Sequence, residues 1–191
     1  KAKQEKIDKA NKKNEVATKE VLSAVVDSTV SDTVKLQKLT GALGSFAYSA
    51  TLPSAKESFT TIENNLIKLT IANKGGYISE AILKNYKKFE KNSGQLVELI
   101  KNNNANFNLE LQTKDNRVLN TKDLFFEPTL TKNGEDQILS MKLKAGPNEF
   151  LEYKYVLKAK DYMLDFDVRS QGLNKVLNTS KNADLQWDLK T

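Results

Sequence analysis

Residues 59–89 read FTTIENNLIKLTIANKGGYISEAILKNYKKF and carry the clearest structural pattern in the chain. From residue 67 to residue 71 (IKLTI), apolar and polar side chains alternate, as in a strand with one buried face. Residues 73–76 (NKGG) follow, and glycine accepts a positive φ angle without a steric clash. We therefore predict a turn with positive φ at Gly75 or Gly76, within a hairpin of a β-sandwich.

The same period-two alternation continues along the rest of the chain. Strands with one apolar and one polar face are typical of antiparallel sheets, and many short ones separated by turn residues predict a sandwich or barrel. We expect an all-β fold, an antiparallel β-sandwich with no long helix after Phe59. The alternating segments are 107–111, 139–143, 151–157, 162–168 and 185–189.

Residues 1 to about 34 differ in composition from the remainder, and residues 1–50 are predicted to be a spacer that precedes a sandwich domain at 51–191. Acid–lysine pairs four residues apart favour a helix before residue 20, whereas valines between 16 and 30 oppose one. The spacer is expected to be partly helical or disordered, and a lysine face that touches anionic lipid is a further alternative. Residues 36–50 are interpreted as a loop, anchored on the sandwich by Leu39, Leu43, Phe46 and Tyr48.

The composition limits the chemistry that the chain can perform. Its 191 residues include no cysteine and no histidine, which excludes thiol catalysis and histidine-based acid–base or metal chemistry. The net charge of +6 comes mainly from lysine, because arginine occurs only at 117 and 169. Bidentate contacts to phosphates and bases favour arginine. We therefore predict no enzyme activity, no cofactor and no nucleic-acid partner.

Acidic and glycine-rich segments offer no convincing catalytic or metal-binding site. Asp165 and Asp167 could act as paired carboxylates or calcium ligands, but a solvated strand face with Lys154 and Arg169 nearby accounts for them. The Gly-Gly pair at 75–76 lacks the surrounding pattern of a phosphate-binding loop. No catalytic, cofactor-binding or metal-binding residue is therefore predicted.

Two aromatic positions carry structural predictions. Trp187 is interpreted as a core residue, since it shares a strand face with Leu185 and Leu189. Phe125 and Phe126 are adjacent, so one of the two rings is expected to point outward.

Several short patterns occur in the order of one known family. Residues 48–56 (YSATLPSAK) precede the hairpin at 59–89. Residues 153–174 have the pattern of a second hairpin, and residues 185–189 (LQWDL) form a strand that carries the tryptophan. In this order the chain resembles the large periplasmic domain of the YidC family of membrane protein insertases, of the Bacteroidetes type. The residues that match the family pattern are structural ones: Glu63, Asn64, Gly75, Gly76, Ile78, Leu83, Tyr86 and Trp187.

The resemblance implies a location and a function. It implies a periplasmic segment of a bacterial inner-membrane protein, with membrane helices before Lys1 and after Thr191. That protein would assist the insertion and folding of inner-membrane proteins, alone or with the Sec translocon. This segment would support or dock rather than catalyse, in contact with Sec subunits or nascent inner-membrane proteins. The family fold is similar to that of aldose epimerases, but a chain without histidine cannot perform their acid–base chemistry.

A carbohydrate- or protein-binding sandwich module of a cell-envelope protein is the alternative. The family pattern continues past the tryptophan strand with further strands and closing helices, so the sandwich here is expected to be incomplete. The strand around Trp187 should then lie at or near a sheet edge and expose apolar surface. This predicts either self-association of the 191-residue chain or a longer native chain.

Overall fold

A computed structural model describes residues 32–90, 94–102 and 104–190. The prediction of a partly helical or disordered segment over residues 1–31 lies outside these residues. The described part begins with helix α2 (Asp32–Leu43), the 3-10 turn η1 (Gly44–Phe46) and the short helix α3 (Ala47–Ala50). Strands follow, interrupted by the 3-10 turns η2 (Thr121–Asp123) and η3 (Leu173–Lys175).

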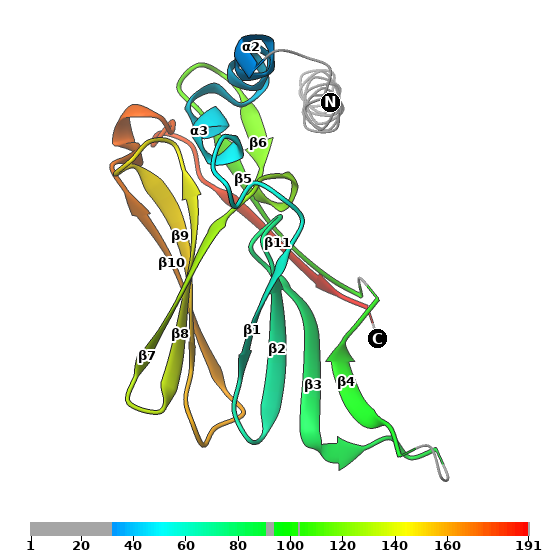
Figure 1. Cartoon of the computed structure of the whole chain (residues 1–191). Helices are drawn as coiled ribbons and strands as arrows, with labels where there is room; N and C mark the ends of the chain where they lie inside the picture. Colours follow the sequence, from blue (N-terminus) through cyan, green and yellow to red (C-terminus); the bar gives the residue numbers. More distant parts are fainter. Residues whose placement is uncertain (1–31, 91–93, 103, 191) are drawn as a thin grey trace.

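The strands form three antiparallel sheets (Figure 1). The first has the order β1-β2-β3-β4 and the second β10-β9-β8-β7, and a smaller sheet has the order β11-β5-β6. The strands are β1 (Phe59–Glu63), β2 (Ile67–Ala72), β3 (Ile78–Lys87), β4 (Leu96–Ile100), β5 (Ala105–Gln112), β6 (Val118–Asn120), β7 (Glu127–Asn133), β8 (Asp136–Lys144), β9 (Phe150–Leu157), β10 (Leu164–Gln171) and β11 (Asp184–Leu189).

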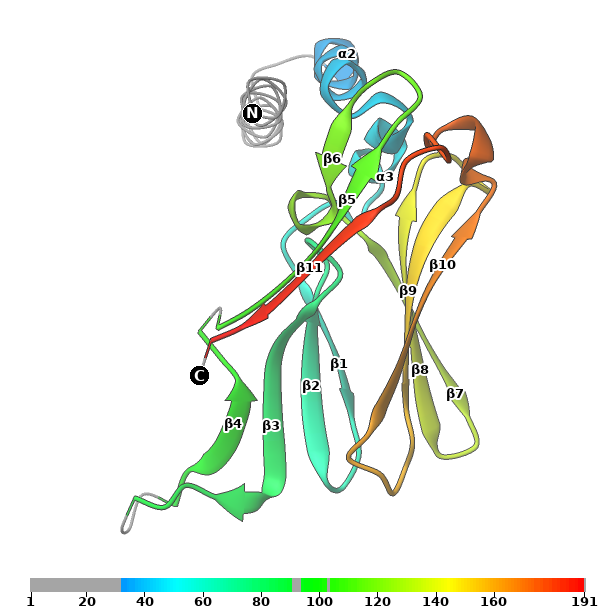
Figure 2. The same ribbon diagram turned by 180° about the vertical axis from the view of Figure 1, so that it is seen from behind.

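One hydrophobic core joins these sheets. Along β2, β8 and β9, buried apolar residues alternate with half-exposed ones, as period-two alternation predicts. The two four-stranded sheets stand side by side (Figures 1 and 2), and their inner faces contribute to the same buried cluster. The prediction of an antiparallel, sandwich-like, mostly β fold is confirmed, and after Phe59 the described residues contain no helix longer than a 3-10 turn.

The Gly-Gly turn links β2 to β3. Gly75 has φ of 85° and Gly76 has φ of 66°, which confirms the prediction of positive φ. The amide of Gly75 donates to the carbonyl of Leu124 at 2.8 Å, so the turn also ties the first sheet to the segment before β7. A β-carbon on Gly76 would lie 3.0 Å from the ring of Phe126. Glycine is therefore required both for the backbone conformation and for space.

The loop predicted over residues 36–50 is wrong, because these residues are helical. Leu39 and Leu43 are spaced four apart, so in a helix they fall on one face, and both are buried in the common core. Phe46 is also buried, while Tyr48 is half-buried. Burial of three apolar anchors on the sheets stabilises helix in a segment whose glycines suggest a loop.

Arg117 holds helix α2 against the sheets. Its Nε and Nη2 atoms donate to the carbonyl oxygen of Gly41 at 3.2 and 3.1 Å, and Nη1 pairs with Asp115. Burial raises the pKa of Asp115, but hydrogen bonds from Thr113 and Arg117 outweigh it and leave the pKa below its ordinary value. The last turn of α2 is thus fixed to the β5–β6 hairpin.

Strand β5 departs from simple alternation at Asn108, which the pattern places on a polar face. Asn108 is fully buried, with a side-chain hydrogen bond of 2.8 Å to Asn120, and it accepts one of 3.3 Å from the amide of Lys122. The turn η2 covers this face of β5. The side-chain amide of Asn108 is therefore buried on a face that the pattern assigns to solvent, and its hydrogen bonds compensate for that burial.

The two adjacent phenylalanines behave as predicted. Phe126 is fully buried against Tyr153, with ring centroids 4.8 Å apart. Phe125 remains half-buried, and the ammonium of Lys74 lies 5.9 Å from its ring centroid. Consecutive residues of an extended segment point in opposite directions, so one ring enters the core and the other faces outward.

Candidate functional site

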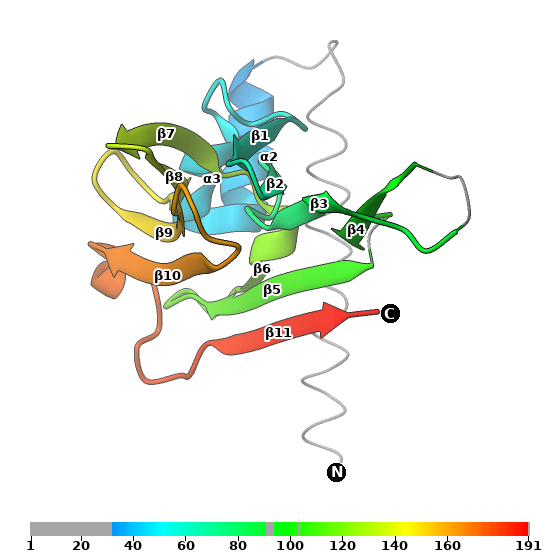
Figure 3. The same cartoon turned by 90° about the horizontal axis from the view of Figure 1, so that it is seen from below.

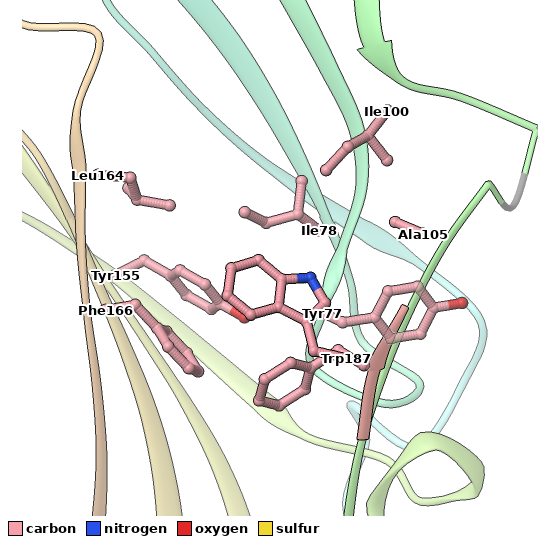
Figure 4. A pocket seen from close by; sticks show the side chains of 9 residues that line it. Tyr77, Ile78, Ile100, Ala105, Tyr155, Leu164, Phe166 and Trp187 are labelled. Atoms are coloured by element: carbon pink, nitrogen blue, oxygen red, sulfur yellow. The ribbon is translucent and has the colours of Figure 1, made fainter. Parts of the chain in front are cut away.

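An apolar groove lies between the edge strands β10 and β11 (Figure 4). Its volume is about 240 Å³, and its walls come from β3, β4, β5, β9, β10 and β11. The lining side chains are almost all apolar or aromatic: Tyr77, Ile78, Ile100, Ala105, Phe107, Tyr155, Leu164, Phe166 and Trp187. Such a surface is suited to contact with apolar groups.

Aromatic rings from separate strands line the groove and contact one another. Phe107 of β5 is paired directly with Trp187 of β11, with ring centroids 6.4 Å apart. Phe107 also lies 5.4 Å from Phe166 of β10, at a right angle to it. Phe166 in turn lies 4.8 Å from Tyr155 of β9. Phe107 therefore bridges the second and third sheets, which no strand pairing joins among the described residues.

Trp187 is 74% exposed, so the prediction that it is a core residue is wrong. The prediction that its strand lies at a sheet edge is confirmed within the described residues, where β11 pairs with β5 alone. The apolar pattern of β11 was correctly identified, but no described element covers that face. Other exposed apolar residues of the two edge strands are Phe166, Val168, Leu185 and Leu189.

The polar groups at the groove are few, and one of them, the Tyr155 hydroxyl, is already hydrogen-bonded. The hydroxyl of Tyr155 donates to the carbonyl oxygen of Gly76 at 2.7 Å. Burial raises the pKa of this hydroxyl far above its ordinary range, and the neighbouring Tyr153 adds to the shift. Burial likewise raises the pKa of Tyr153. Both phenols therefore remain neutral, and the lining contains no charged side chain.

These two tyrosines predict alkaline destabilisation. Ionised phenolate is disfavoured in the folded state, so above the ordinary tyrosine pKa of 10.0 the unfolded state releases protons that the folded state keeps. The free energy of unfolding should thus fall as pH rises through and above that value. Urea unfolding at successive pH values measures it. Tyr155→Phe should lower stability at neutral pH, because it removes a buried hydrogen bond, yet show a shallower alkaline decline. An equal slope in both proteins would contradict this assignment.

The residues that match the family pattern do not all lie at the groove. Ile78 and Trp187 line it, and the carbonyl oxygen of Gly76 accepts a hydrogen bond from Tyr155, which also lines it. Glu63 pairs with Lys84 at 2.6 Å, and this hydrogen bond lowers the pKa of Glu63.

Other pattern residues lie toward the opposite end of the hairpin. The amide of Asn64 donates to the carbonyls of Lys158 and Asp161, at 2.8 and 2.7 Å. Tyr86 lies 6.1 Å from Tyr162 between ring centroids, and Leu83 pairs with Ile67. Their assignment as structural residues of the family pattern remains a prediction. Phe107 and Phe166, which form the groove, are absent from the pattern because their role depends on strand pairings far apart in sequence.

Asp165 and Asp167 lie on the edge strand β10, and each is close to a positively charged side chain. Asp165 pairs with Lys158 at 3.4 Å and Asp167 with Arg169 at 3.0 Å. All four side chains are more than half exposed. In the part of the chain that the structure describes, no three His, Cys, Asp or Glu residues are grouped as metal ligands would be. These acids fit a solvated strand face, where ion pairs contribute little.

The fold and the groove define an antiparallel β-sandwich domain with an exposed apolar surface. A family model described as the YidC periplasmic domain matches residues 60–191. The chain belongs to this family.

Curated relatives agree with this assignment. Proteins named "Membrane protein insertase YidC" are similar to the chain in Parabacteroides distasonis (37% identity, covering 91% of this chain and 27% of the relative), in Bacteroides fragilis (35%, covering 75% and 22%) and in Porphyromonas gingivalis (29%, covering 90% and 26%). The chain thus spans about a quarter of the length of these relatives. No solved structure matches it significantly. Among the described helices, none has the length and apolar character needed to cross a membrane.

Proposed function

We propose that this chain is the periplasmic part of a bacterial inner-membrane insertase, which assists insertion and folding of inner-membrane proteins, alone or with the Sec translocon. The observation that carries the proposal is the family match over residues 60–191. The relatives are named as membrane protein insertases, and the proposal extends that activity to this chain by membership of the family.

Within that protein, this domain serves as a docking surface and performs no catalysis. Support comes from the groove, whose walls are apolar and whose rim carries the exposed ring of Trp187. The chain also lacks histidine and cysteine. Hydrophobic segments of nascent inner-membrane proteins, or apolar surfaces of Sec subunits, match such walls in chemistry.

The groove is less suited to a carbohydrate. Sugar recognition requires hydrogen-bonding groups that orient the hydroxyls, and the only side-chain polar groups in the lining are the hydroxyls of Tyr77 and Tyr155 and the indole N–H of Trp187. The Tyr155 hydroxyl already donates to Gly76. The apolar walls therefore favour a protein partner over the carbohydrate alternative.

Site-specific photo-cross-linking in the full-length protein in its own cells tests the docking role. A photoreactive amino acid at position 187 should cross-link to Sec subunits or to a radiolabelled nascent inner-membrane protein. The control position is Leu130, which is exposed on β7, at the opposite edge of the second sheet from β10, and lies outside the groove. Equal cross-linking from both positions, or none from position 187, would contradict docking at the groove.

Two further measurements test the role of the groove in insertion and the absence of catalysis. Trp187→Ser in the same cells should slow insertion of a model single-span inner-membrane protein, read out by protease protection, while Leu130→Ser should not. The purified chain should not accelerate sugar mutarotation above the buffer rate. Turnover in that assay would overturn the non-catalytic role, whereas normal insertion with Trp187→Ser would remove the groove from the mechanism.

A further inference from the structure

The end of the fold opposite α2 exposes large side chains from two connections between strands (Figure 1). Phe89 follows β3 and is fully exposed, and Met163, between β9 and β10, is 71% exposed. Tyr86 and Tyr162 join the two connections, with ring centroids 6.1 Å apart. These four residues are called the tip below. None of them lines the groove, so the tip is a separate exposed region.

The backbone of β3 is bent in a way that carries Phe89 out of the sheet. The pairing of β3 with β4 shifts register between Leu83 and Lys87, and residues 84–86 have no partner in β4. Extra residues in one strand form a bulge, which bends that strand and redirects its side chains. Seen from below (Figure 3), the end of the β3–β4 hairpin accordingly projects beyond the other strands.

Both connections are supported by residues outside them. The ammonium of Lys88 donates to the carboxylate of Glu98 on β4 at 2.9 Å, beside Phe89. The side-chain amide of Asn64 donates to the carbonyl oxygens of Lys158 and Asp161, at 2.8 and 2.7 Å. These contacts hold the backbone on both sides of the tip, so its side chains are presented at defined positions.

The tip is surrounded by positive charge. Residues 84–90 contain three lysines and one glutamate, and residues 158–163 contain two lysines and one aspartate. Lys87 and Lys160 are exposed, and neither forms an ion pair with any described residue. Their ammonium groups therefore remain available to an anion next to the apolar side chains.

We propose that the tip contacts a lipid bilayer that contains anionic phospholipid. Phe89 and Met163 would enter the interface, with Lys87 and Lys160 beside the lipid phosphates. Aromatic side chains together with lysines are typical of residues at a membrane interface. A protein partner would need a pocket matched to each projecting side chain, whereas a fluid bilayer accepts them singly. The choice of a bilayer rests on the proposed location of this segment at the inner membrane, and it adds a lipid contact to the proposed function.

Quenching by lipid in the full-length protein, reconstituted into liposomes, tests the contact. An environment-sensitive fluorescent amino acid is placed at position 89 or, as the matched control, at position 59. Phe59 is also an exposed phenylalanine, but it begins β1, at the other end of that strand from Asn64. In liposomes of phosphatidylglycerol and phosphatidylcholine, brominated acyl chains should quench the probe at position 89 and not at position 59. Phosphatidylcholine alone should quench position 89 much less.

Substitutions separate the apolar and the charged contributions. The probe is placed at position 163, and its quenched fraction gives the equilibrium constant for contact with the bilayer. Phe89→Ser should lower this constant about tenfold, because one ring is no longer buried. Lys87→Gln and Lys160→Gln should each lower it about fivefold, and high salt should abolish that difference. The control is Lys38→Gln, which removes an exposed lysine from α2 and should change nothing.

Two results would overturn the proposal: no quenching at position 89 in anionic liposomes, or equal quenching at positions 89 and 59. Photo-cross-linking from position 89 to a protein in cells, without lipid quenching, would assign the tip to a protein partner instead. The groove is tested separately by the insertion defect of Trp187→Ser, so a failure of the tip contact and a failure of the proposed function are distinguishable.

Discussion

Gly76→Val is expected to destabilise the domain by about 4 kcal/mol, through backbone strain and overpacking together. Gly76 has φ of 66°, a conformation that β-branched residues rarely adopt. A β-carbon there would also lie 3.0 Å from Cγ of Phe126 and 3.1 Å from Cδ2 of Tyr153. Both rings are buried, so neither can yield without disturbing the core. Urea unfolding monitored by circular dichroism measures the loss.

Gly134→Val separates the two causes. Gly134 has nearly the same φ, 62°, in the β7–β8 turn, but nothing lies within 4 Å of its hypothetical β-carbon. Only the backbone penalty applies there, so the expected loss is about 2 kcal/mol. Equal losses at the two positions would show that the rings of Phe126 and Tyr153 accommodate the new side chain, and that the turn does not act as a packing element.

Leu43→Ala is expected to cost about 3 kcal/mol, because it opens a cavity in the common core. Leu43 is only 1% exposed, although it lies in a helix of the segment predicted to be a spacer. Leu36→Ala is the matched control, since Leu36 belongs to the same helix but is 48% exposed. That change should alter the free energy of unfolding by no more than about 0.5 kcal/mol. Both values come from equilibrium unfolding in urea.

The contrast between these two leucines also tests the proposed domain boundary at residues 50 and 51. A large loss for Leu43→Ala, with cooperative unfolding, would show that residues 39–46 fold as part of the sandwich domain. The boundary would then have to move toward the N-terminus. Little loss at both positions would favour a spacer that only rests on the surface.

Local patterns were sufficient to predict many of the strands and the glycine turn. Period-two alternation depends on a strand's own residues, and positive φ at a Gly-Gly pair depends on the missing β-carbon. The resemblance to the insertase family was also visible from the order of these patterns. Alternation gave the face of Trp187 correctly, but it could not reveal whether another element covers that face. The helix over residues 32–43 was missed because its stability comes from burial against sheets that are distant in sequence.

The groove itself could not be derived in advance. Phe107, Phe166 and Trp187 meet only because β5, β10 and β11 are brought together by pairings across long stretches of chain. Asn108 illustrates the same limit, since a residue assigned to a wet face is buried by the turn that follows β6. Alternation assigns a side chain to one face of a sheet, whereas tertiary contacts determine what lies against that face.

The pairing of β5 with β11 has a consequence for how this domain forms as the polypeptide is made. The hydrogen bond from Asn108 to Gln186 joins residues 78 positions apart, and the bond from Asn64 to Lys158 spans 94. Closing such long loops is slow, and the first partner must wait until the second has been synthesised. During vectorial delivery β5 therefore spends a long interval with one bare edge, and the arrival of β11 ends that exposure.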